Sequence, residues 1–600
     1  MCGIAGYIGE KDGLKIVLDR LKLLEYRGYD SAGVLFFSNT GAKLKKSKGK
    51  LNVLSKKLGS TSALPLLAVI GHTRWATHGI PNEKNAHPHT DCNKKIFLAH
   101  NGIIENYQEL RQQLSKTGHV FKSQTDTEII AHLIEECCKS NLSFEKAFET
   151  ALTKVVGAYA LAVVYTDEPE RIYFAKLGSP LIIGVAEKEY FLASDPTALA
   201  GMAKKIMYLK DGQRGWLSAS GHKIGPTRPK MENLNLSPEQ AQKGKFPHFM
   251  IKEISEQPET VRDAFRGRLF ANRVKLGGLE NVARELEKIK RIEIIACGTS
   301  YHAGLLGELL LEEIAGIPTK VIEASEYRYR DNVLSPMTAC LFISQSGETA
   351  DTLAALRKAN GRKALTLGLV NTVGSAIARE TKAGVYNHAG PEIGVASTKA
   401  FTSQLSILNL IALFLAKNSR KRKLLARELN LIPEKIKTTI KDGGKIKLLA
   451  KKYQKYNNFM FLGRKYNYPA ALEGALKLKE IGYVHAEGKA AGELKHGPIA
   501  LIDKDFPTIA LVNKNSVYEK MISNLEEIKT RGGRILAIAT IGDKKISKIA
   551  DDVIYVPKTL EPLEPLLNVI PLQIFAYYFG VARGHDVDKP RNLAKSVTVE

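Results

Sequence analysis

The chain has 600 residues, which is too long for a single hydrophobic core and indicates several domains. Its 44% apolar and 25% charged residues are ordinary for a soluble globular protein, and its formal net charge is +26. The basic residues are scattered, without a zinc-finger, RNP or basic-zipper pattern, so we expect a basic surface that attracts anionic small molecules and no nucleic-acid partner.

The number of cysteines and the hydropathy pattern indicate the kind of protein and its cellular compartment. Six cysteines in 600 residues are too few for a disulfide framework, and no CxxC or Cys/His pattern has the spacing of metal ligands. The apolar stretches Leu64–Ile70 and Leu405–Leu415 are shorter than the roughly 18 uncharged residues of a membrane-spanning helix. The N-terminus lacks the basic-then-apolar pattern of a signal peptide. We expect a soluble, cytoplasmic protein with no metal and no membrane partner.

At the N-terminus, Met1-Cys2-Gly3-Ile4 places a thiol directly behind the initiator methionine. Because cysteine is small, an aminopeptidase is expected to remove Met1 and to leave Cys2 as the first residue. Cys2 then carries a sulfur nucleophile and an α-amine that titrates near about pH 8 and can take the thiol proton. An isolated Met-Cys pair would mean little, so this interpretation depends on the rest of the chain.

Residues 2–240 are predicted to form a strand-rich domain. Helical patterns at 13–25, 105–116 and 126–139 alternate with short β-type runs at Ala68–Gly71, Ile96–His100, Leu161–Tyr165, Arg171–Phe174 and Leu181–Val185. A segment rich in Pro, Asn, Gln and Lys at 226–247 is predicted to be a linker, and we assign 241–284 to linker and connecting helices.

The rest of the chain has the pattern of an internal duplication. Strands predicted at Ile292–Ala296 and Phe459–Leu462 each end in a glycine-containing turn that leads into a helix, and further apolar strands alternate with helices after each, at Ala339–Ile343, Ala364–Val370, Thr508–Val512 and Arg534–Ala539. Such alternation is typical of βαβ units and a parallel sheet. We predict two α/β/α domains, at 285–425 and 450–585, and a tail at 586–600 that is too polar for the core.

Three places in the first half could bind a substrate. Arg74 follows an apolar strand and could hold a carboxylate with two hydrogen bonds, or lie in a surface loop beside a half-buried Trp75. Asn101 and Gly102 could supply two donors to an oxyanion, or form a simple Asn-Gly turn. Asp126 could bind an ammonium group or cap the helix that follows, and capping is the commoner role.

These residues lie in five stretches that resemble the class II glutamine amidotransferases, which are N-terminal-nucleophile hydrolases. The stretches are MCGIAGYIG at the terminus, EYRGYDSAG at 25–33, HTRWATHG at 72–79, HNGIIEN at 100–106 and SQTDTE at 123–128. The resemblance implies an αββα fold in which Cys2 attacks the glutamine amide. It further implies that Arg74 holds the substrate carboxylate, that Asn101 and Gly102 form the oxyanion hole, and that Asp126 binds the amine.

In the second half, Ser344-Gln345-Ser346-Gly347-Glu348-Thr349 follows a predicted strand and opens the predicted helix Ala350–Lys358. Hydroxyl groups and backbone N–H groups at a helix N-terminus form an anion site, and phosphate is the natural ligand. Ser300, after the first strand of the same domain, would form a second wall of this site. The alternative is an ordinary Ser/Thr helix cap.

The second repeat contains a predicted helix, Tyr468–Tyr483, in which Glu473, Lys477 and Glu480 share one face. Spacing alone favours a solvated face with salt bridges. His496 lies beside a Gly-Pro turn. Lys595 lies in the polar tail, where a frayed end would be the ordinary interpretation.

These stretches resemble the paired sugar-isomerase (SIS) domains of the glucosamine-6-phosphate synthase family, whose domains are of the flavodoxin-like α/β type. The matching segments are CGTS at 297–300, SQSGETADTL at 344–353, EIGVASTKAF at 392–401, LEGALKLKE at 472–480, ELKHGP at 493–498 and PRNLAKSVTVE at 590–600. With the front half, the resemblance covers essentially all 600 residues. It implies a sugar-phosphate cradle made of Ser300, Ser344, Gln345, Ser346 and Thr349, beside the loop Val395–Ser397.

The same resemblance assigns the chemistry of the second half. It implies Lys595 as the Schiff-base lysine, Glu480 as the isomerase base and His496 as the ring-opening histidine. Glu473 and Lys477 would be their supporting acid and amine.

The resemblance implies conversion of fructose 6-phosphate and glutamine to glucosamine 6-phosphate and glutamate, with no metal or organic cofactor, by a homodimer joined through its SIS domains. Ammonia released at Cys2 would pass Trp75, the gate of a shielded path, and displace Lys595 from C2 of the sugar. Glu480 would then move a proton from C1 to C2. The tail that carries Lys595 is expected to close over the sugar.

Rival interpretations require features that the sequence lacks. An asparagine synthetase would need a Ser-Gly-Gly-x-Asp-Ser loop for ATP, and an amidophosphoribosyltransferase an acidic pyrophosphate-binding motif after a strand. A non-enzymatic sugar-phosphate sensor would lack Glu480 and Lys595 and would usually carry a helix-turn-helix. None of these patterns fits the chain.

Overall fold

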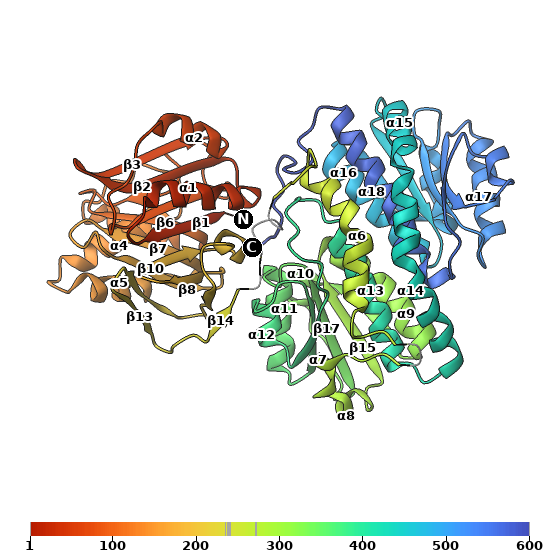
Figure 1. Cartoon of the computed structure of the whole chain (residues 1–600), viewed down its shortest axis with the longest axis horizontal. Coiled ribbons are helices and arrows are strands. Elements are labelled where there is room, and N and C mark those ends of the chain that lie inside the picture. Colours follow the sequence, from red (N-terminus) through yellow and green to blue (C-terminus); the bar gives the residue numbers. More distant parts are fainter. Residues whose placement is uncertain (1, 235, 237–241, 271–272, 599–600) are drawn as a thin grey trace. The chain divides into compact units, whose positions relative to one another are not determined.

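The computed structural model describes residues 2–234, 236, 242–270 and 273–598 of the chain. It divides into two compact units, Met1–Gln242 together with Ala594–Glu600, and Lys243–Leu593 (Figure 1). Within the described ranges, the sheets of the first unit are antiparallel and those of the second are parallel.

The first unit contains an eight-stranded and a six-stranded sheet. The larger has the strand order β14-β11-β9-β10-β1-β4-β2-β3 and comprises β1 (Gly3–Ile8), β2 (Ser31–Ser38), β3 (Gly41–Lys48), β4 (Val69–Arg74), β9 (Ile182–Ala186), β10 (Glu189–Ala193), β11 (Lys205–Tyr208) and β14 (Met231–Asn233). The smaller has the order β13-β12-β8-β7-β6-β5 and comprises β5 (His89–Thr90), β6 (Ile96–Ile104), β7 (Gly157–Tyr165), β8 (Ile172–Leu177), β12 (Arg214–Ser218) and β13 (Gly221–Gly225). The α-helices are α1 (Gly13–Leu24), α2 (Leu51–Leu58), α3 (Tyr107–Lys116), α4 (Glu128–Cys138) and α5 (Phe144–Leu152).

Four layers make up this unit, in the order helix, sheet, sheet, helix. One apolar cluster, with Ile4 and Phe97 among its members, fills the space between the two sheets. A second cluster joins α1 and α2 to the outer face of the larger sheet, and a third joins α3, α4 and α5 to the outer face of the smaller one. The αββα arrangement is therefore confirmed, and the helices predicted at 13–25, 105–116 and 126–139 match α1, α3 and α4 within two residues at each end.

Strand β1 lies in the interior of the eight-stranded sheet, between β10 and β4, and both of its faces are apolar. Side chains alternate along a strand, so Ile4 and Ile8 enter the core between the sheets, while Ala5 and Tyr7 face α1. All six residues of β1 are buried. Cys2, which immediately precedes β1, is thereby held at the end of the central strand.

The second unit contains two five-stranded parallel sheets. The first has the order β16-β15-β17-β18-β19, from β15 (Arg291–Ala296), β16 (Thr319–Glu323), β17 (Thr338–Ser344), β18 (Leu365–Val370) and β19 (Ala383–Tyr386). The second has the order β21-β20-β22-β23-β24, from β20 (Asn458–Gly463), β21 (His485–Ala490), β22 (Thr508–Val512), β23 (Ile535–Thr540) and β24 (Asp552–Val556). Because both sheets follow the flavodoxin-like order 2-1-3-4-5, the predicted duplication is confirmed.

Helices flank these sheets and join them. They are α6 (Phe249–Phe265), α7 (Gly277–Glu280), α8 (Ala283–Leu286), α9 (Gly298–Leu310), α10 (Ala324–Tyr327), α11 (Ala350–Gly361), α12 (Ala376–Glu380), α13 (Lys399–Leu415), α14 (Ser419–Lys441), α15 (Gly443–Tyr453), α16 (Asn467–Gly482), α17 (Tyr518–Lys529) and α18 (Glu564–Ala582). One apolar cluster continues from the first repeat into the second through α6, α13, α14, α15, α16 and α18. The two repeats therefore share a core, which is why they form one compact unit.

An apolar stretch longer than the two named from the sequence lies at Glu561–Ala582. In the described part of the chain, it is the one helix that length and composition would allow to cross a membrane, and 83% of its most apolar window is buried. A helix that is hydrophobic all round is typical of a protein core, and α18 packs against α15 and α16 in this one.

Two expectations at the ends of the units are wrong in part. The predicted linker at 226–247 includes β14, which pairs with β11 at the edge of the larger sheet; residues 235 and 237–241 lie outside the described chain. The tail at 586–600 does contribute to a core, since Val587 and Asp588 are buried. The Asp588 carboxylate accepts hydrogen bonds from the backbone N–H groups of Phe249 and Met250, and these bonds satisfy its buried charge.

Candidate functional site

In the first unit, Cys2 lies where β1 meets β4. The backbone N–H of Trp75 donates to its Sγ at 3.3 Å, and Asn101 Nδ2 donates to its backbone carbonyl at 2.9 Å. Burial raises the pKa of the Cys2 thiol, and the Trp75 hydrogen bond opposes that rise. The thiol therefore needs a nearby base to become a nucleophile.

Arg74, the last residue of β4, is only 3% exposed, so it does not lie in a surface loop. Its Nη2 donates to the carbonyl oxygens of His78 and Gly79, whereas Nη1 is buried and has no partner in the described chain. A buried N–H without an acceptor is costly, so this side of the guanidinium suits a bound carboxylate. Gly28 permits the arrangement, because a Cβ there would lie 2.7 Å from the Arg74 carbonyl carbon.

Asn101 and Gly102 lie inside strand β6, so the interpretation as a turn is wrong. Gly102 has a φ of +137°, and a Cβ there would collide with the carbonyl oxygen of Ala158 on β7. Only glycine fits at this position of β6, because it has no Cβ and tolerates this backbone conformation.

His72 orients Asn101, and the sequence interpretation missed it. Its Nε2 lies 3.0 Å from both the His100 carbonyl oxygen and Asn101 Oδ1, so it carries the proton and donates. Burial lowers the pKa of His72 to about 3, so the ring is neutral at physiological pH. The bond to Oδ1 turns Nδ2 of Asn101 toward Cys2. A signal was present, because residues two apart on a strand, such as His72 and Arg74, share a face.

Asp126 does not cap α4, whose N-cap is Thr127. Its Oδ2 accepts the backbone N–H of Ile104 at 2.9 Å, and its side chain is buried. The loop before α4 is also held by Glu128, which accepts the N–H groups of Lys122 and Ser123 at 2.8 and 2.7 Å. Asp126 is thus a buried carboxylate fixed to the end of β6, three residues beyond Asn101.

In the second unit, Glu473, Lys477 and Glu480 on α16 form an ion-pair cluster in which the first two are buried and Glu480 is half-buried, so the solvated face that spacing favoured is wrong. Lys477 Nζ lies 3.4 Å from Glu473 Oε1 and 2.5 Å from Glu480 Oε2. Glu473 and Lys477 are at most 1% exposed. Burial lowers the pKa of Lys477, but the two carboxylates more than offset this and raise it, so the ammonium form is secured.

Two residues of α9 complete this cluster and were missed. Thr299 Oγ1 donates to Glu473 Oε1 and accepts from Lys477 Nζ, both at 3.1 Å, and His302 Nδ1 lies 2.8 Å from Glu473 Oε2. Thr299 and His302 are three residues apart on a helix and so share a face. Their position in the first repeat, opposite α16 of the second, was not visible in the sequence.

The loop Ser344–Thr349 after β17 is folded on its own hydroxyl groups. Ser344 Oγ lies 2.9 Å from Thr349 Oγ1 and accepts the N–H of Gly347 at 3.0 Å. Ser346 Oγ accepts the N–H of Glu348 at 3.1 Å. Thr349 is the N-cap of α11 but makes no side-chain capping bond, so the loop is more than an ordinary Ser/Thr cap.

The other predicted residues of the sugar site lie in separate environments. Ser300 Oγ accepts from Gln404 Nε2 at 3.0 Å, and Ser397 Oγ donates to Glu392 Oε2 at 2.9 Å. The backbone of Gln345 accepts the N–H of Asn371, and that of Val395 donates to Asp588. His496 is exposed between two short 3₁₀ turns, and Lys595 belongs by its contacts to the first unit. The roles of these residues stay predictions.

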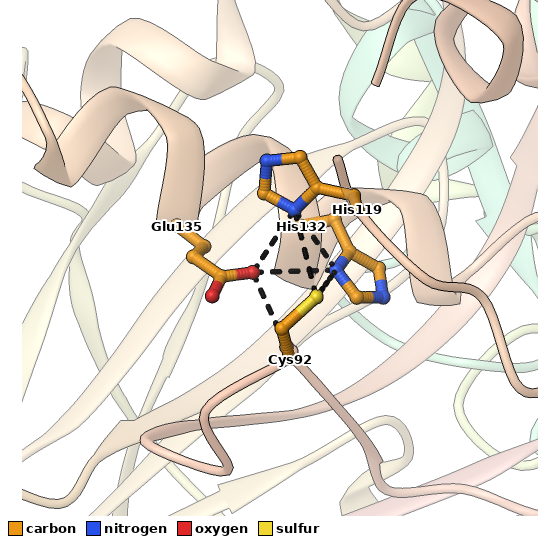
Figure 2. Close-up of side chains that lie close together, drawn as sticks. All are labelled: Cys92, His119, His132 and Glu135. Carbon is orange, nitrogen blue, oxygen red and sulfur yellow. Dashed lines mark hydrogen bonds and ion pairs between the residues drawn. The ribbon is translucent and has the colours of Figure 1, made fainter. Parts of the chain in front are cut away.

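A further group of side chains could hold a metal ion. Cys92, His119, His132 and Glu135, all in the first unit, converge so that one donor atom from each lies within 4.8 Å of the others (Figure 2). No ligand spacing in the sequence had indicated them.

The chain resembles known proteins along its whole length. A family model described as SIS domain matches residues 285–414 and 452–583, and one described as glutamine amidotransferase domain matches residues 72–201. Proteins named glutamine–fructose-6-phosphate aminotransferase (isomerizing) from Chlorobaculum tepidum, Bacteroides thetaiotaomicron and Thermus thermophilus are 48%, 47% and 46% identical to the chain, with full coverage of both sequences in each case.

Among solved structures, the C-terminal domain of glucosamine-fructose-6-phosphate aminotransferase from Francisella tularensis is 38% identical, with a TM-score of 0.56. The match covers 58% of this chain and 99% of that one. It accounts for the paired parallel sheets of the second unit.

Proposed function

This chain belongs to the family of isomerising glutamine–fructose-6-phosphate aminotransferases, and we propose that it converts fructose 6-phosphate and glutamine to glucosamine 6-phosphate and glutamate. One observation carries the proposal: a single chain, aligned end to end with such enzymes, combines a half-buried thiol in an αββα unit with an acid–amine cluster in a paired SIS unit, where Glu473 and Lys477 are buried. The proposed reaction would supply the amino sugar for the synthesis of nucleotide-activated N-acetylglucosamine.

The first unit hydrolyses glutamine. Removal of Met1 makes the α-amine of Cys2 the base that its buried thiol needs. The unpaired Nη1 of Arg74 binds the glutamine α-carboxylate, and Asp126 binds the α-ammonium. Asn101 Nδ2 and the Gly102 N–H stabilise the oxyanion that forms when sulfur attacks the amide. Because Asn101 Nδ2 already points toward Cys2 in the free protein, this donor is preorganised.

The second unit isomerises the sugar. The hydroxyl and backbone N–H groups of Ser344–Thr349, with Ser300 nearby, bind the phosphate. His496 opens the sugar ring, and Lys595 forms an imine at C2 that ammonia displaces. Glu480 then moves a proton between C1 and C2. Lys477, which stays an ammonium ion, holds the carboxylate of Glu480 in position.

Transfer between the two reactions requires protection of the ammonia, since free ammonia protonates and escapes in water. We assign Trp75 as the gate, because its backbone contacts the Cys2 thiol, whose attack on the glutamine amide releases the ammonia. We further propose that the enzyme is a cytoplasmic homodimer joined through its SIS domains, which sedimentation of the purified chain would test.

The decisive experiment measures both half-reactions in one variant. Cys2→Ala should abolish glutamine hydrolysis and leave the isomerisation of fructose 6-phosphate intact, whereas the wild-type enzyme should form glucosamine 6-phosphate only when both substrates are present. Glutamine hydrolysis at the wild-type rate in Cys2→Ala would overturn the assignment of the nucleophile. Product formation from fructose 6-phosphate alone would overturn the function.

A further inference from the structure

We propose that Cys92, His119, His132 and Glu135 bind one zinc ion, and that this ion is structural. The cluster joins three segments of the first unit: the turn between β5 and β6 carries Cys92, the loop after α3 carries His119, and α4 carries the other two. The side chains point toward a common centre (Figure 2). None of them takes part in the reaction proposed above.

The donor atoms are spaced as in a tetrahedral site. Zn²⁺ bonds of about 2.0–2.3 Å to nitrogen, oxygen and sulfur place neighbouring donors about 3.3–3.6 Å apart. Here the two Nδ1 atoms of His119 and His132 are 3.2 Å apart, and Cys92 Sγ is 3.9 and 3.5 Å from them. Glu135 Oε2 is 3.0 Å from His119 Nδ1 and 3.3 Å from His132 Nδ1. The sixth pair, Cys92 Sγ and Glu135 Oε2, lies within 4.8 Å, so the group is gathered closely enough for one ion to draw the four donors together.

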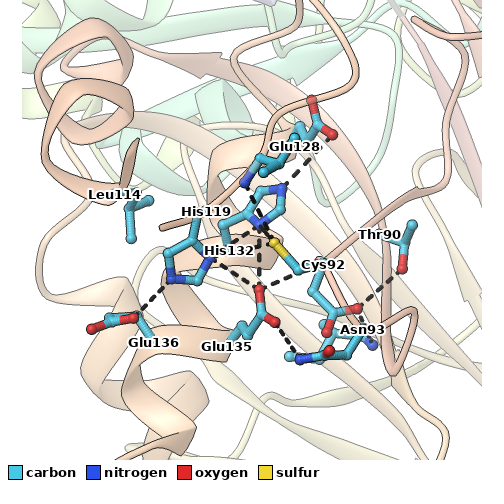
Figure 3. A network of polar contacts seen from close by, with 12 residues as sticks. Thr90, Cys92, Asn93, Leu114, His119, Glu128, His132, Glu135 and Glu136 are labelled. Carbon is cyan, nitrogen blue, oxygen red and sulfur yellow. Dashed lines mark hydrogen bonds and ion pairs between the residues drawn. The ribbon is translucent and has the colours of Figure 1, made fainter. Parts of the chain in front are cut away.

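The surrounding hydrogen bonds orient these donors toward the centre (Figure 3). With an ion bound, His119 Nε2, which lies 2.8 Å from Glu136 Oε2, would carry the proton and donate to that carboxylate, and the lone pair of Nδ1 would face the ion. Asn93 Nδ2 donates to Glu135 Oε1 at 2.7 Å, and the Val120 N–H donates to Cys92 Sγ at 3.5 Å. Carboxylate partners of ligating histidines and N–H bonds to ligating sulfur are typical of the shell around a metal.

A cation also resolves a conflict between the groups. With neutral rings, the Nδ1 lone pair of His119 would face the Glu135 carboxylate at 3.0 Å, which is repulsive. The competing interpretation is a doubly protonated His119 that pairs with Glu135 and Glu136. Metal analysis separates the two, because only the first requires an ion.

The donor set identifies the metal class and its role. One sulfur, two imidazole nitrogens and one carboxylate oxygen suit Zn²⁺ and disfavour Mg²⁺ or Ca²⁺, which prefer oxygen ligands alone. Four protein ligands leave no open position for a substrate, as in structural zinc sites. His119, His132 and Glu135 are buried, so the ion would be shielded from solvent.

The ion would fix the loop that carries Asp126. His119 and His132 bracket that loop, and Glu128, one helical turn before His132, accepts two of the loop's N–H groups. Loss of the ion would free the loop at both ends. This consequence rests on the proposed function, in which Asp126 binds the ammonium group of glutamine. Protein without the ion should then have a raised KM for glutamine and an unchanged rate of sugar isomerisation.

Metal content is the first test, and it is independent of activity. The full-length protein, purified without a metal-affinity tag and dialysed, should contain about one zinc per chain by plasma mass spectrometry. Cys92→Ser and His119→Ala should lose it, and Cys138→Ser, a half-buried cysteine of α4 outside the cluster, should keep it. A wild-type protein without stoichiometric metal after incubation with Zn²⁺ would overturn the proposal.

Two further measurements guard against variants that fail to fold. Wild-type protein stripped with a chelator and reloaded with Co²⁺ should show the intense visible bands of tetrahedral cobalt and a thiolate-to-cobalt charge-transfer band that Cys92→Ser lacks. Glu136→Ala should weaken zinc binding about 10–100-fold without removing a ligand. Octahedral cobalt spectra would overturn the site. A raised glutamine KM in stripped protein, restored by Zn²⁺, supports the link to Asp126; an unchanged KM overturns that link but not the metal.

Discussion

The two repeats of the second unit have the same strand order and different chemistry at equivalent helices. In the first repeat, the helix after the first strand, α9, presents Thr299 and His302; in the second, the equivalent α16 presents Glu473, Lys477 and Glu480. These two helices pack against each other, so the duplicated positions form one site with opposite contributions. The duplicated fold thus provides two equivalent helices with different side chains. Helix α16 carries the acid and amine groups, and α9 carries the hydroxyl and imidazole groups that bond to them.

The last helices of the repeats differ in the same way. Helix α13 begins at buried Lys399, which pairs with Glu256 at 2.8 Å, whereas α18 begins at buried Glu564, which accepts from the amides of Asn467 and Asn515 at 2.8 and 2.7 Å. An opposite charge accompanies the lysine, and neutral amides accompany the glutamate. The two equivalent helices therefore begin at buried residues of opposite charge.

The largest effect is expected on the rate of sugar isomerisation, from a substitution in α16. Glu480→Gln keeps the shape of the side chain and an oxygen that can accept from Lys477, but it removes the carboxylate proposed as the base. The rate of fructose 6-phosphate isomerisation should fall about 10²–10⁴-fold, while glutamine hydrolysis is retained. A rate of sugar isomerisation within twofold of wild type would show that the base lies elsewhere.

The next effect is on stability. Lys477→Ala leaves the carboxylates of Glu473 and Glu480 without their shared ammonium, and an unpaired buried charge costs about 3–5 kcal/mol. Denaturant unfolding of the second unit should show this loss. Lys479→Ala, an exposed lysine on the same helix, should change stability by less than about 0.5 kcal/mol. Equal losses in the two variants would contradict the burial argument.

The buried carboxyl group of Glu564 predicts that the stability of the protein depends on pH. Burial raises the pKa of Glu564 to about 7, so the folded protein binds a proton between its ordinary pKa of 4.5 and 7 that the unfolded chain releases. Stability should therefore fall as pH rises through this window, by about 3 kcal/mol at most. Glu564→Gln should flatten the profile and be the more stable protein above pH 7. A profile as steep in Glu564→Gln as in wild type would refute it.

The smallest effect compares two glycines. Gly347 of the first repeat has a φ of +66° and lies against Ser375, whereas Gly532 of the second has a φ of +71° and open space around it. Alanine costs about 1–2 kcal/mol at either position for the backbone conformation. At Gly347 it should also displace the phosphate loop and raise the KM for fructose 6-phosphate, whereas Gly532→Ala should leave that KM unchanged. The same KM for fructose 6-phosphate in both variants would show that binding of the sugar does not depend on the backbone conformation at Gly347.

Much of the fold was predictable because periodicity is local. The helices around residues 13–25, 105–116 and 126–139, and the strands of both repeats, follow from alternation of apolar residues over short windows. The roles of Cys2, Arg74 and Asn101 were proposed from short motifs, and the structure places all three around β1, β4 and β6.

Burial and pairing were less predictable. Spacing placed Glu473, Lys477 and Glu480 on one face but indicated solvent, because a helical face does not reveal what packs against it. Capping of α4 was the commoner of the two roles considered for Asp126, but the Asp126 carboxylate accepts a hydrogen bond from β6 instead. His72 was overlooked because its role is to orient Asn101, 29 residues away.

The cluster of Cys92, His119, His132 and Glu135 is the clearest case. Its ligands are separated by 27, 13 and 3 residues along the chain, which no short metal motif has. The expectation of no metal stands against this cluster, and zinc analysis decides between them.

The elements, the duplication and the thiol behind Met1 can be found from the sequence alone, because each depends on residues that are neighbours in the chain. Tertiary packing sets which charged groups are buried and which partners they meet: Lys477 between two carboxylates, and Cys92 with two histidines and a glutamate. The physical reason is that dielectric environment and pairing are set by packing between elements far apart in sequence, whereas periodicity records only which face of an element is apolar.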